Sequence, residues 1–292
     1  MSLVVTGATG HLGRLVVESL IDSGVAAADI VATGRSLDRL RELADRGVQV
    51  READYADPAS LRAAFTGAHR LLLVSGLDPQ VRVQQHRNAI EAAREAGVEL
   101  LAYTSIVNAD TSTLKLAEDH LATEALLRGS GVPFVLLRNS WYLENYTAQL
   151  APVLEHGVLV GSAGEGRVSA AARADYAAAA AVVLTTDGHA GRAYELGGDT
   201  PFTLAELAAE ITAQSGTPVR YTDLPEADHV RTLTAHGLPQ DFAEILADAD
   251  QGLGRGELHT ASGDLARLIG RPSTPLKEAV AAAVHATAAV PQ

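Results

Sequence analysis

The residues with the clearest chemical signature lie near the N-terminus, in the segment VTGATGHLG (residues 5–13). Gly7, Gly10 and Gly13 follow a short apolar run and precede an amphipathic stretch. In a strand–loop–helix unit, such glycines supply a tight turn, close backbone approach to a pyrophosphate, and close helix packing, in that order. The free N–H groups of the helix N-terminus then face the phosphates. The alternative is a plain glycine turn, but the context favours a dinucleotide site made by Gly7, Gly10 and Gly13.

The end of the second apolar run, ATGRSLDRL (residues 32–40), bears on the choice of dinucleotide. Binders of NAD place an acid there to bond the ribose 2′-hydroxyl, whereas this chain has Arg35 and Ser36. A guanidinium binds a 2′-phosphate through paired hydrogen bonds, so Arg35 favours NADP(H). The alternative is a solvated arginine at a helix start. Asp54, after the third run, either meets the adenine amino group or caps a local turn.

Further candidates follow from the rule that ligands of open α/β sheets lie at the carboxyl ends of the strands. After the fourth, fifth and sixth runs these positions hold Val74, Ser75 and Gly76, then Thr104 and Ser105, then Arg138, Asn139 and Ser140. Short-chain reductases usually add a Tyr-x-x-x-Lys pair on the next helix, where the lysine lowers the pKa of the tyrosine for proton donation. Here Leu116 and His120 stand in those places, which disfavours a substrate that needs strong acid catalysis.

Two candidate catalytic residues remain, His120 and Tyr142. A neutral His120 imidazole can bond a nicotinamide ribose hydroxyl or relay a proton near pH 7, or it is a packing residue. Tyr142 belongs to RNSWYLENY (residues 138–146), which gathers the single tryptophan, Trp141, with Asn145 and Tyr146 in a chain with few aromatic residues. These rings either stack on a flat substrate or simply pack in the core.

Several function classes are disfavoured. The net charge of −13 opposes nucleic acid and anionic lipid as partners. The chain has no cysteine, and its histidines lack the spacing typical of metal ligands, so no metal is predicted. Ser105 lacks the G-x-S-x-G context of a hydrolase nucleophile. No run approaches the ~20 apolar residues of a membrane span, and a cytoplasmic protein is expected, either a monomer or a homodimer.

The elements that position these residues alternate regularly in the first half of the chain. Short apolar runs near residues 3–6, 29–34, 48–54, 70–75, 99–105 and 133–139 are separated by amphipathic stretches. This alternation predicts an α/β fold, a Rossmann-type doubly wound parallel sheet over residues 1–140. A smaller C-terminal α+β lobe over residues 141–292 is expected to bind the substrate, with about 168–196 returning to the sheet. We expect Asp175 to cap one helix of the second half, and Thr203 with Glu206 to form a capping box on another.

Longer motifs add a family resemblance. The segments VTGATGHLG, QHRNAIEAAREAGV, AYTSIVNADTS, LAEDHLATEALLRGSGV and LLRNSWYLENY resemble the atypical short-chain dehydrogenase/reductase family, in its NmrA-like branch. Within that branch the chain is similar to bacterial NADPH-dependent quinone oxidoreductases and triphenylmethane reductases. The resemblance spans nearly the whole chain, and the last segment is far more specific than the glycine loop.

The resemblance implies hydride transfer from NADPH to quinones without a flavin. A quinone is already a strong hydride acceptor, so positioning supplies most of what is needed. The cofactor would be held by Gly7, Thr9, Gly10, His11, Leu12 and Gly13 of the glycine loop, together with Arg35, Ser75 and Gly76. The quinone would lie near Asn139 to Trp141, with Asn145 of the same segment as a further substrate-binding candidate. Gly34 departs from the relatives, which have a bulkier residue before the arginine. The branch also implies two alternatives, a non-catalytic NADP-sensing regulator and a reductase of other flat, electron-poor acceptors such as dyes.

Overall fold

The centre of the molecule is a seven-stranded parallel sheet in a computed structural model that describes residues 1–288. Its strands lie in the order β3-β2-β1-β4-β5-β6-β8. They are β1 (Leu3–Val5), β2 (Ile30–Gly34), β3 (Gln49–Glu52), β4 (Arg70–Leu73), β5 (Leu100–Ile106), β6 (Phe134–Asn139) and β8 (Ala193–Leu196). Every neighbouring pair is parallel, which confirms the predicted doubly wound sheet.

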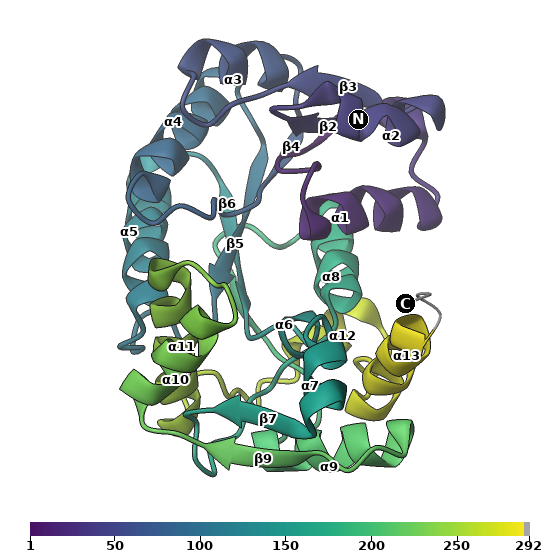
Figure 1. Cartoon of the computed structure of the whole chain (residues 1–292). Helices are drawn as coiled ribbons and strands as arrows, with labels where there is room; N and C mark the ends of the chain where they lie inside the picture. Colours follow the sequence, from purple (N-terminus) through teal and green to yellow (C-terminus); the bar gives the residue numbers. More distant parts are fainter. Residues whose placement is uncertain (289–292) are drawn as a thin grey trace.

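Helices cover both faces of this sheet, as Figure 1 shows. One face packs against α1 (His11–Asp22), α8 (Arg173–Thr185) and α12 (Asp264–Ile269), and the other against α3 (Pro58–Phe65), α4 (Arg82–Glu95) and α5 (Lys115–Ser130). The short elements η1 (Ala27–Asp29), η2 (Leu37–Leu40) and α2 (Arg41–Asp45) lie between β1 and β3 in the chain.

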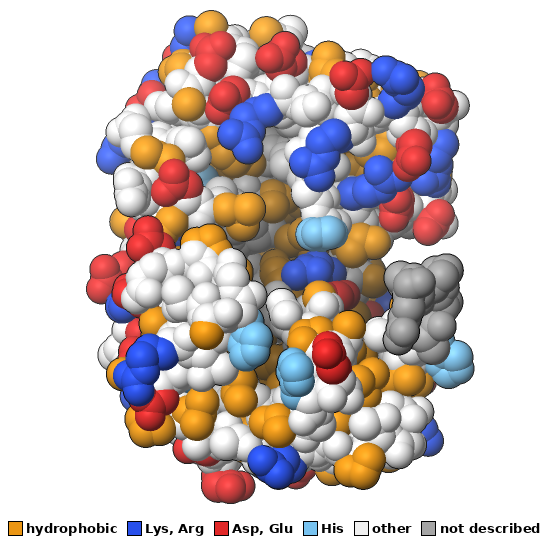
Figure 2. All heavy atoms as spheres, in the orientation of Figure 1, with side chains coloured by type: hydrophobic (Ala, Val, Ile, Leu, Met, Phe, Trp, Pro, Cys, Tyr) orange, Lys and Arg blue, Asp and Glu red, His pale blue; other side chains and the backbone are white. Residues whose placement is uncertain are grey.

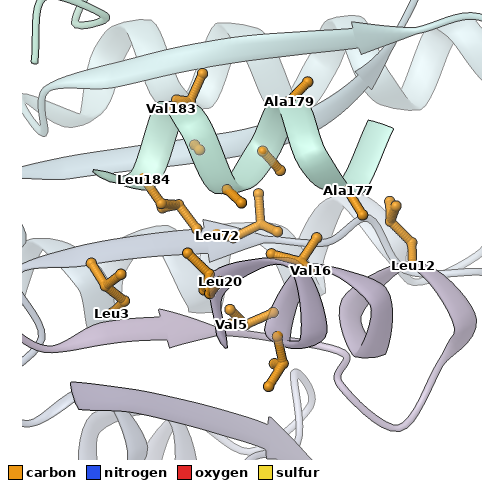
Figure 3. Close-up of a cluster of buried hydrophobic side chains, with 14 of the residues drawn as sticks. Leu3, Val5, Leu12, Val16, Leu20, Leu72, Ala177, Ala179, Val183 and Leu184 are labelled. Carbon is orange, nitrogen blue, oxygen red and sulfur yellow. The ribbon is translucent and has the colours of Figure 1, made fainter. Parts of the chain in front are cut away.

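The contact between α1 and α8 shows why the apolar periodicity of α1 matters. Val16 and Leu20, one helical turn apart, are fully buried on the side that faces the sheet and α8 (Figure 3). The small side chains of Ala177 and Ala180 on α8 let the two helices approach closely. Burial of each Val or Leu contributes roughly 1.5–3 kcal/mol, so this packing anchors the helix that carries the glycine loop.

The remaining elements lie beyond the carboxyl ends of the strands, in the lower half of Figure 1. They are α6 (Glu144–Thr147), α7 (Leu150–His156), β7 (Val158–Gly161), α9 (Leu204–Ser215), β9 (Arg220–Asp223), α10 (Glu226–Ala235), α11 (Gln240–Gly254) and α13 (Leu276–Ala288). All of them except α10 contribute to a second hydrophobic cluster. β7 and β9 pair in parallel as a separate two-stranded sheet. Although α8, β8 and α12 follow residue 140 in the chain, they pack with the large sheet. The domain boundary at residues 140 and 141 stays a prediction.

Two local predictions for this half have opposite outcomes. The capping box is confirmed, since the Glu206 N–H donates to Thr203 Oγ1 at 3.1 Å and the Thr203 N–H donates to Glu206 Oε2 at 2.9 Å. The prediction that Asp175 caps α8 is wrong, because the helix begins at Arg173 and no side chain caps it. Asp175 instead lies fully buried in the first turn, where it accepts the Thr274 N–H at 2.7 Å. None of the helices in residues 1–288 is both long and apolar enough to cross a membrane.

Candidate active site

The glycine loop between β1 and α1 has the geometry that the sequence predicts. Gly7 adopts a left-handed conformation with φ of +62°, which a side chain disfavours. Gly13 lies against the same turn, so that an added Cβ would stand 2.5 Å from the Gly7 carbonyl oxygen and 2.9 Å from the Ala8 nitrogen. Only glycine allows α1 to start this close to the turn, and both the tight turn and the close packing are confirmed.

The first turn of α1 offers unpaired donors. Gly10 precedes the helix without a side-chain cap, and the first turn holds no acidic residue. Within residues 1–288, no acceptor reaches the backbone N–H groups of His11, Leu12 or Gly13. These donors lie at the positive end of the helix dipole, an arrangement that suits a phosphate. The loop therefore fits the pyrophosphate of a dinucleotide.

The end of β2 lies beside this loop. An added Cβ on Gly34 would stand 2.5 Å from Thr9 Cγ2, so the glycine makes room for the Thr9 side chain. Arg35 is exposed, and no acidic side chain of the described part of the chain pairs with it. An arginine without an internal partner is available for a ligand phosphate.

Asp54 has a local role in the structure. Its Oδ1 accepts the N–H of Ala56 at 2.9 Å, and its own N–H donates to Ser60 Oγ at 3.0 Å. This is the turn-capping alternative that the sequence left open. A contact between Asp54 and adenine stays a prediction.

The ends of β4 and β5 meet next to the glycine loop. An added Cβ on Gly7 would stand 3.3 Å from Val74 Cβ. The Ser75 N–H donates to Thr104 Oγ1 at 2.9 Å, and the Gly76 N–H donates to His86 Nε2 at 2.9 Å. The tertiary structure thus brings together candidates from three strand ends that are far apart in the chain.

Two residues that the sequence analysis did not select, Arg82 and His86, support this loop. Arg82 is buried and its Nε donates to the Gly76 carbonyl oxygen at 2.7 Å. Burial, together with the Arg82 charge, lowers the pKa of His86 to about 3. A neutral His86 accepts the Gly76 N–H through Nε2, and Nδ1 then donates to Thr123 Oγ1 at 2.9 Å. No local pattern marked either residue, since both lie on a regular amphipathic helix.

His120 lies in the interface between α5 and the sheet. It is 5% exposed, and its Nδ1 stands 2.8 Å from the hydroxyl of Tyr103, a fully buried residue of β5. Burial lowers the pKa of His120 to about 3, with Arg82 and His86 adding to the effect. An imidazole that stays neutral is poorly suited to relay protons by titrating near pH 7, and a catalytic role of His120 stays a prediction. Nε2 bonds no other described residue, and the contact with the nicotinamide ribose stays a prediction.

Ser105 and Arg138 belong to a buried ion-pair network instead of a ligand site. The Ser105 hydroxyl donates to Glu124 Oε1 at 2.7 Å. Arg138 donates to both oxygens of Glu124, at 2.9 and 2.8 Å, and to Glu195 Oε1 at 2.7 Å. These interactions raise the pKa of Arg138. The Ser105 hydroxyl proton is therefore engaged within the protein, and the cofactor contact expected of Ser105 stays a prediction.

Asn139 is the last residue of β6, and Tyr142 lies in the segment that follows this strand. Asn139 is 5% exposed, and its Oδ1 is buried without a hydrogen-bond donor in the described chain. An unpaired buried carbonyl costs about 1–3 kcal/mol, so this atom is suited to a ligand donor. The Tyr142 ring packs edge-to-face on Tyr176 and lies 5.0 Å from the Arg173 guanidinium carbon. Burial raises the pKa of Tyr142, and Asn139 and Arg173 oppose the rise.

A cavity of about 570 Å³ opens beside this segment, in the second half of the chain. Trp141 and Asn145, both selected from the sequence, line it together with Tyr146. Its other walls come mainly from α7, α9, β7, α10 and α11 and are largely apolar, except for Gln149, His156, His229, His236 and Asp250. Figure 2 shows the face of the molecule hollowed between its upper and lower halves, with hydrophobic side chains inside. Within the described residues, no three or more histidine and acidic side chains gather as metal ligands would.

The fold and the site define a dinucleotide-binding protein of the Rossmann type. A family model described as NAD(P)H-binding matches residues 7–187, and the chain belongs to this family. It is 50% identical to quinone oxidoreductase 2 of Escherichia coli, over 95% of this chain and 97% of that protein.

Solved structures agree with this assignment. The E. coli NADPH-dependent quinone oxidoreductase QOR2, complexed with NADPH, superposes with a TM-score of 0.93 at 49% identity, over 96% of this chain and 99% of that chain. The triphenylmethane reductase of Citrobacter sp., complexed with NADP(H), superposes with a TM-score of 0.92 at 40% identity, over 97% and 100%. The chain therefore groups with these two reductases, as the sequence motifs predict.

Proposed function

We propose that this protein is an NADPH-dependent reductase that transfers hydride to quinones and related flat, electron-poor acceptors without a flavin. The observation that carries the proposal is the apolar cavity of about 570 Å³ beside the carboxyl end of β6, in a chain of the NAD(P)H-binding family. The likeness to a quinone oxidoreductase over nearly the whole chain supports the same acceptor class. The likeness to a triphenylmethane reductase supports dyes as further acceptors.

Different residues bind different parts of the dinucleotide. The amides of His11, Leu12 and Gly13 hold the pyrophosphate, and Arg35 holds the 2′-phosphate. The Ser75 N–H donates to Thr104 Oγ1 at the ends of β4 and β5, between β1 and β6 in the sheet, and both residues are expected to contact the cofactor.

When bound, the nicotinamide supplies the hydride, and the protein supplies orientation. Asn139 offers an unpaired carbonyl at the end of β6, and the Trp141 side chain forms one wall of the acceptor cavity. An apolar cavity holds a flat acceptor out of water and at a defined angle, which accounts for catalysis without a Tyr-x-x-x-Lys pair.

The test is oxidation of NADPH, and separately of NADH, in the presence of a benzoquinone, a cationic triarylmethane dye and a simple aldehyde. We expect turnover with the quinone and the dye, little with the aldehyde, and a preference for NADPH. Tight binding of NADP without turnover of any acceptor would refute an enzymatic role and favour the sensor alternative.

A further inference from the structure

The proposed reaction needs a proton as well as a hydride. A quinone that gains a hydride becomes a hydroquinone monoanion, and one proton completes the hydroquinone. Neither of the candidate catalytic residues supplies this proton readily, because burial holds His120 neutral and raises the pKa of the Tyr142 hydroxyl. A donor must therefore come from elsewhere in the acceptor cavity or from water.

One acidic side chain lines the cavity, Asp250 of α11. It is 9% exposed, and its Oδ2 accepts the Ser162 N–H at 2.8 Å. The same oxygen stands 3.5 Å from His229 Nδ1, and Ser162 Oγ stands 3.0 Å from that nitrogen. Because both partners share one ring nitrogen, this is not the arrangement of a hydrolytic triad, which uses both nitrogens of the histidine.

The surroundings of Asp250 favour its protonated form. No lysine or arginine in residues 1–288 pairs with it, and burial lowers the pKa of its neighbour His229, which therefore supplies no counter-charge. The other titratable groups that face it are Tyr221 and Asp223 of β9 and Tyr146 of α6. Burial and the negative charge of Asp223 raise the pKa of Asp250 to about 7, against the opposing hydrogen bond from Ser162.

A second observation points to a ligand in the same place. Tyr146 lines the cavity, and its hydroxyl is buried and bonds to no other group in the described chain. A buried hydroxyl without a partner is costly, and a carbonyl oxygen of the acceptor would satisfy it. Oδ1 of Asp250 likewise accepts no hydrogen bond from residues 1–288, which leaves it available to the cavity.

We propose that Asp250 is the proton donor to the reduced acceptor, and that the Tyr146 hydroxyl hydrogen-bonds the acceptor carbonyl to hold it in place. This inference rests on the proposed function. The carboxylic acid O–H bond of Asp250 breaks, an O–H bond of the hydroquinone forms, and the carboxylate regains its proton from water at the cavity mouth. A phenol has a pKa of about 10, so a phenolate takes the proton from such an acid downhill.

The test compares two acceptors that differ in their need for a proton. A quinone needs a hydride and a proton, whereas the central carbon of a cationic triarylmethane dye takes a hydride alone. In Asp250→Asn, which keeps an oxygen for the Ser162 N–H, we expect the ratio of quinone to dye kcat to fall about 100-fold, the low end for loss of a general acid. Asp241→Asn, at an exposed site on the same helix, is the matched control and keeps the wild-type ratio.

Acceptor binding is measured without cofactor. Trp141 is the only tryptophan and lines the cavity, so quenching of its fluorescence by a quinone reports occupancy. We expect the same Kd in Asp250→Asn as in the wild type, and weaker binding in Tyr146→Phe. An unchanged quinone-to-dye ratio in Asp250→Asn would overturn the proposal, as would a failure of quinones to quench Trp141.

The wild type provides a further check that does not depend on a variant folding. Quinone kcat should fall as the pH rises through about 7, because Asp250 loses its proton, whereas dye kcat should lack this step. Parallel profiles for the two acceptors would contradict the assignment. Wild-type protein that reduces neither acceptor would instead contradict the proposed function.

Discussion

Arg35→Ala provides a direct test of nucleotide choice. Arg35 is exposed and bonds no acidic side chain in the described chain, so its removal should leave the free energy of unfolding within about 0.5 kcal/mol of wild type. Its effect should fall on the 2′-phosphate. Hydrogen bonds to charged groups contribute about 1.5–3 kcal/mol, and exposure to solvent and salt favours the lower end. We expect KM for NADPH to rise about 10-fold and KM for NADH to change little.

The assay is the initial rate of nicotinamide oxidation with a saturating quinone, measured for each nucleotide at low and high salt. Added salt should raise KM for NADPH in the wild type and have less effect in the variant. The matched control is Arg46→Ala, an exposed arginine at the opposite, amino-terminal edge of the sheet. An equal rise of both KM values in Arg35→Ala, or the same selective rise in Arg46→Ala, would refute the role of Arg35.

Three further predictions address the loop, the core and the acceptor site. Gly13→Ala should raise KM for NADPH and NADH alike, because the added Cβ would overlap the Gly7 carbonyl and displace the loop. The expected rise is at least about 10-fold, which corresponds to the loss of one hydrogen bond to a charged group. A selective effect on NADPH would contradict this. Glu124→Gln should lower the free energy of unfolding, measured with urea, by about 3 kcal/mol, since it leaves the buried Arg138 charge with less compensating negative charge. Glu118→Gln, at an exposed site, is its control. Asn139→Leu should lower kcat/KM for the quinone. The Tm of the ligand-free protein should stay equal or rise, because the buried Asn139 oxygen has no hydrogen-bond donor in the described chain. A lower Tm would show that Asn139 has a structural role.

The sequence alone determined the features that depend on local chemistry. The apolar alternation of the first half predicted the parallel sheet, because a strand followed by an amphipathic helix packs in one way. The glycine spacing predicted the turn at Gly7 and the helix contact at Gly13, since both depend on backbone sterics within a few residues. The cap formed by Thr203 and Glu206 followed from the same kind of short-range interaction.

The tertiary structure decided which polar side chains are buried and which partners they bond. Ser105 and His120 occupy plausible positions in the sequence, yet one is bonded to Glu124 and the other to Tyr103 in the interior. Asp175 is fully buried and bonds Thr274, which is 99 residues away in the chain. Burial and partners supplied by distant segments set the pKa and availability of a group, and no local pattern encodes them.

The acceptor cavity is the clearest case of this division. Trp141 and Asn145 were evident from an unusual cluster of aromatic residues, but Asp250 and His229 lie on ordinary amphipathic helices. Asp250 contacts Ser162 across 88 residues of chain. The sequence by itself determined the sheet and the dinucleotide loop, because these follow from short-range periodicity and backbone geometry. Only folding decided which acids and hydroxyls share a cavity with Trp141, because that depends on the docking of α10 and α11 against β7 and α6.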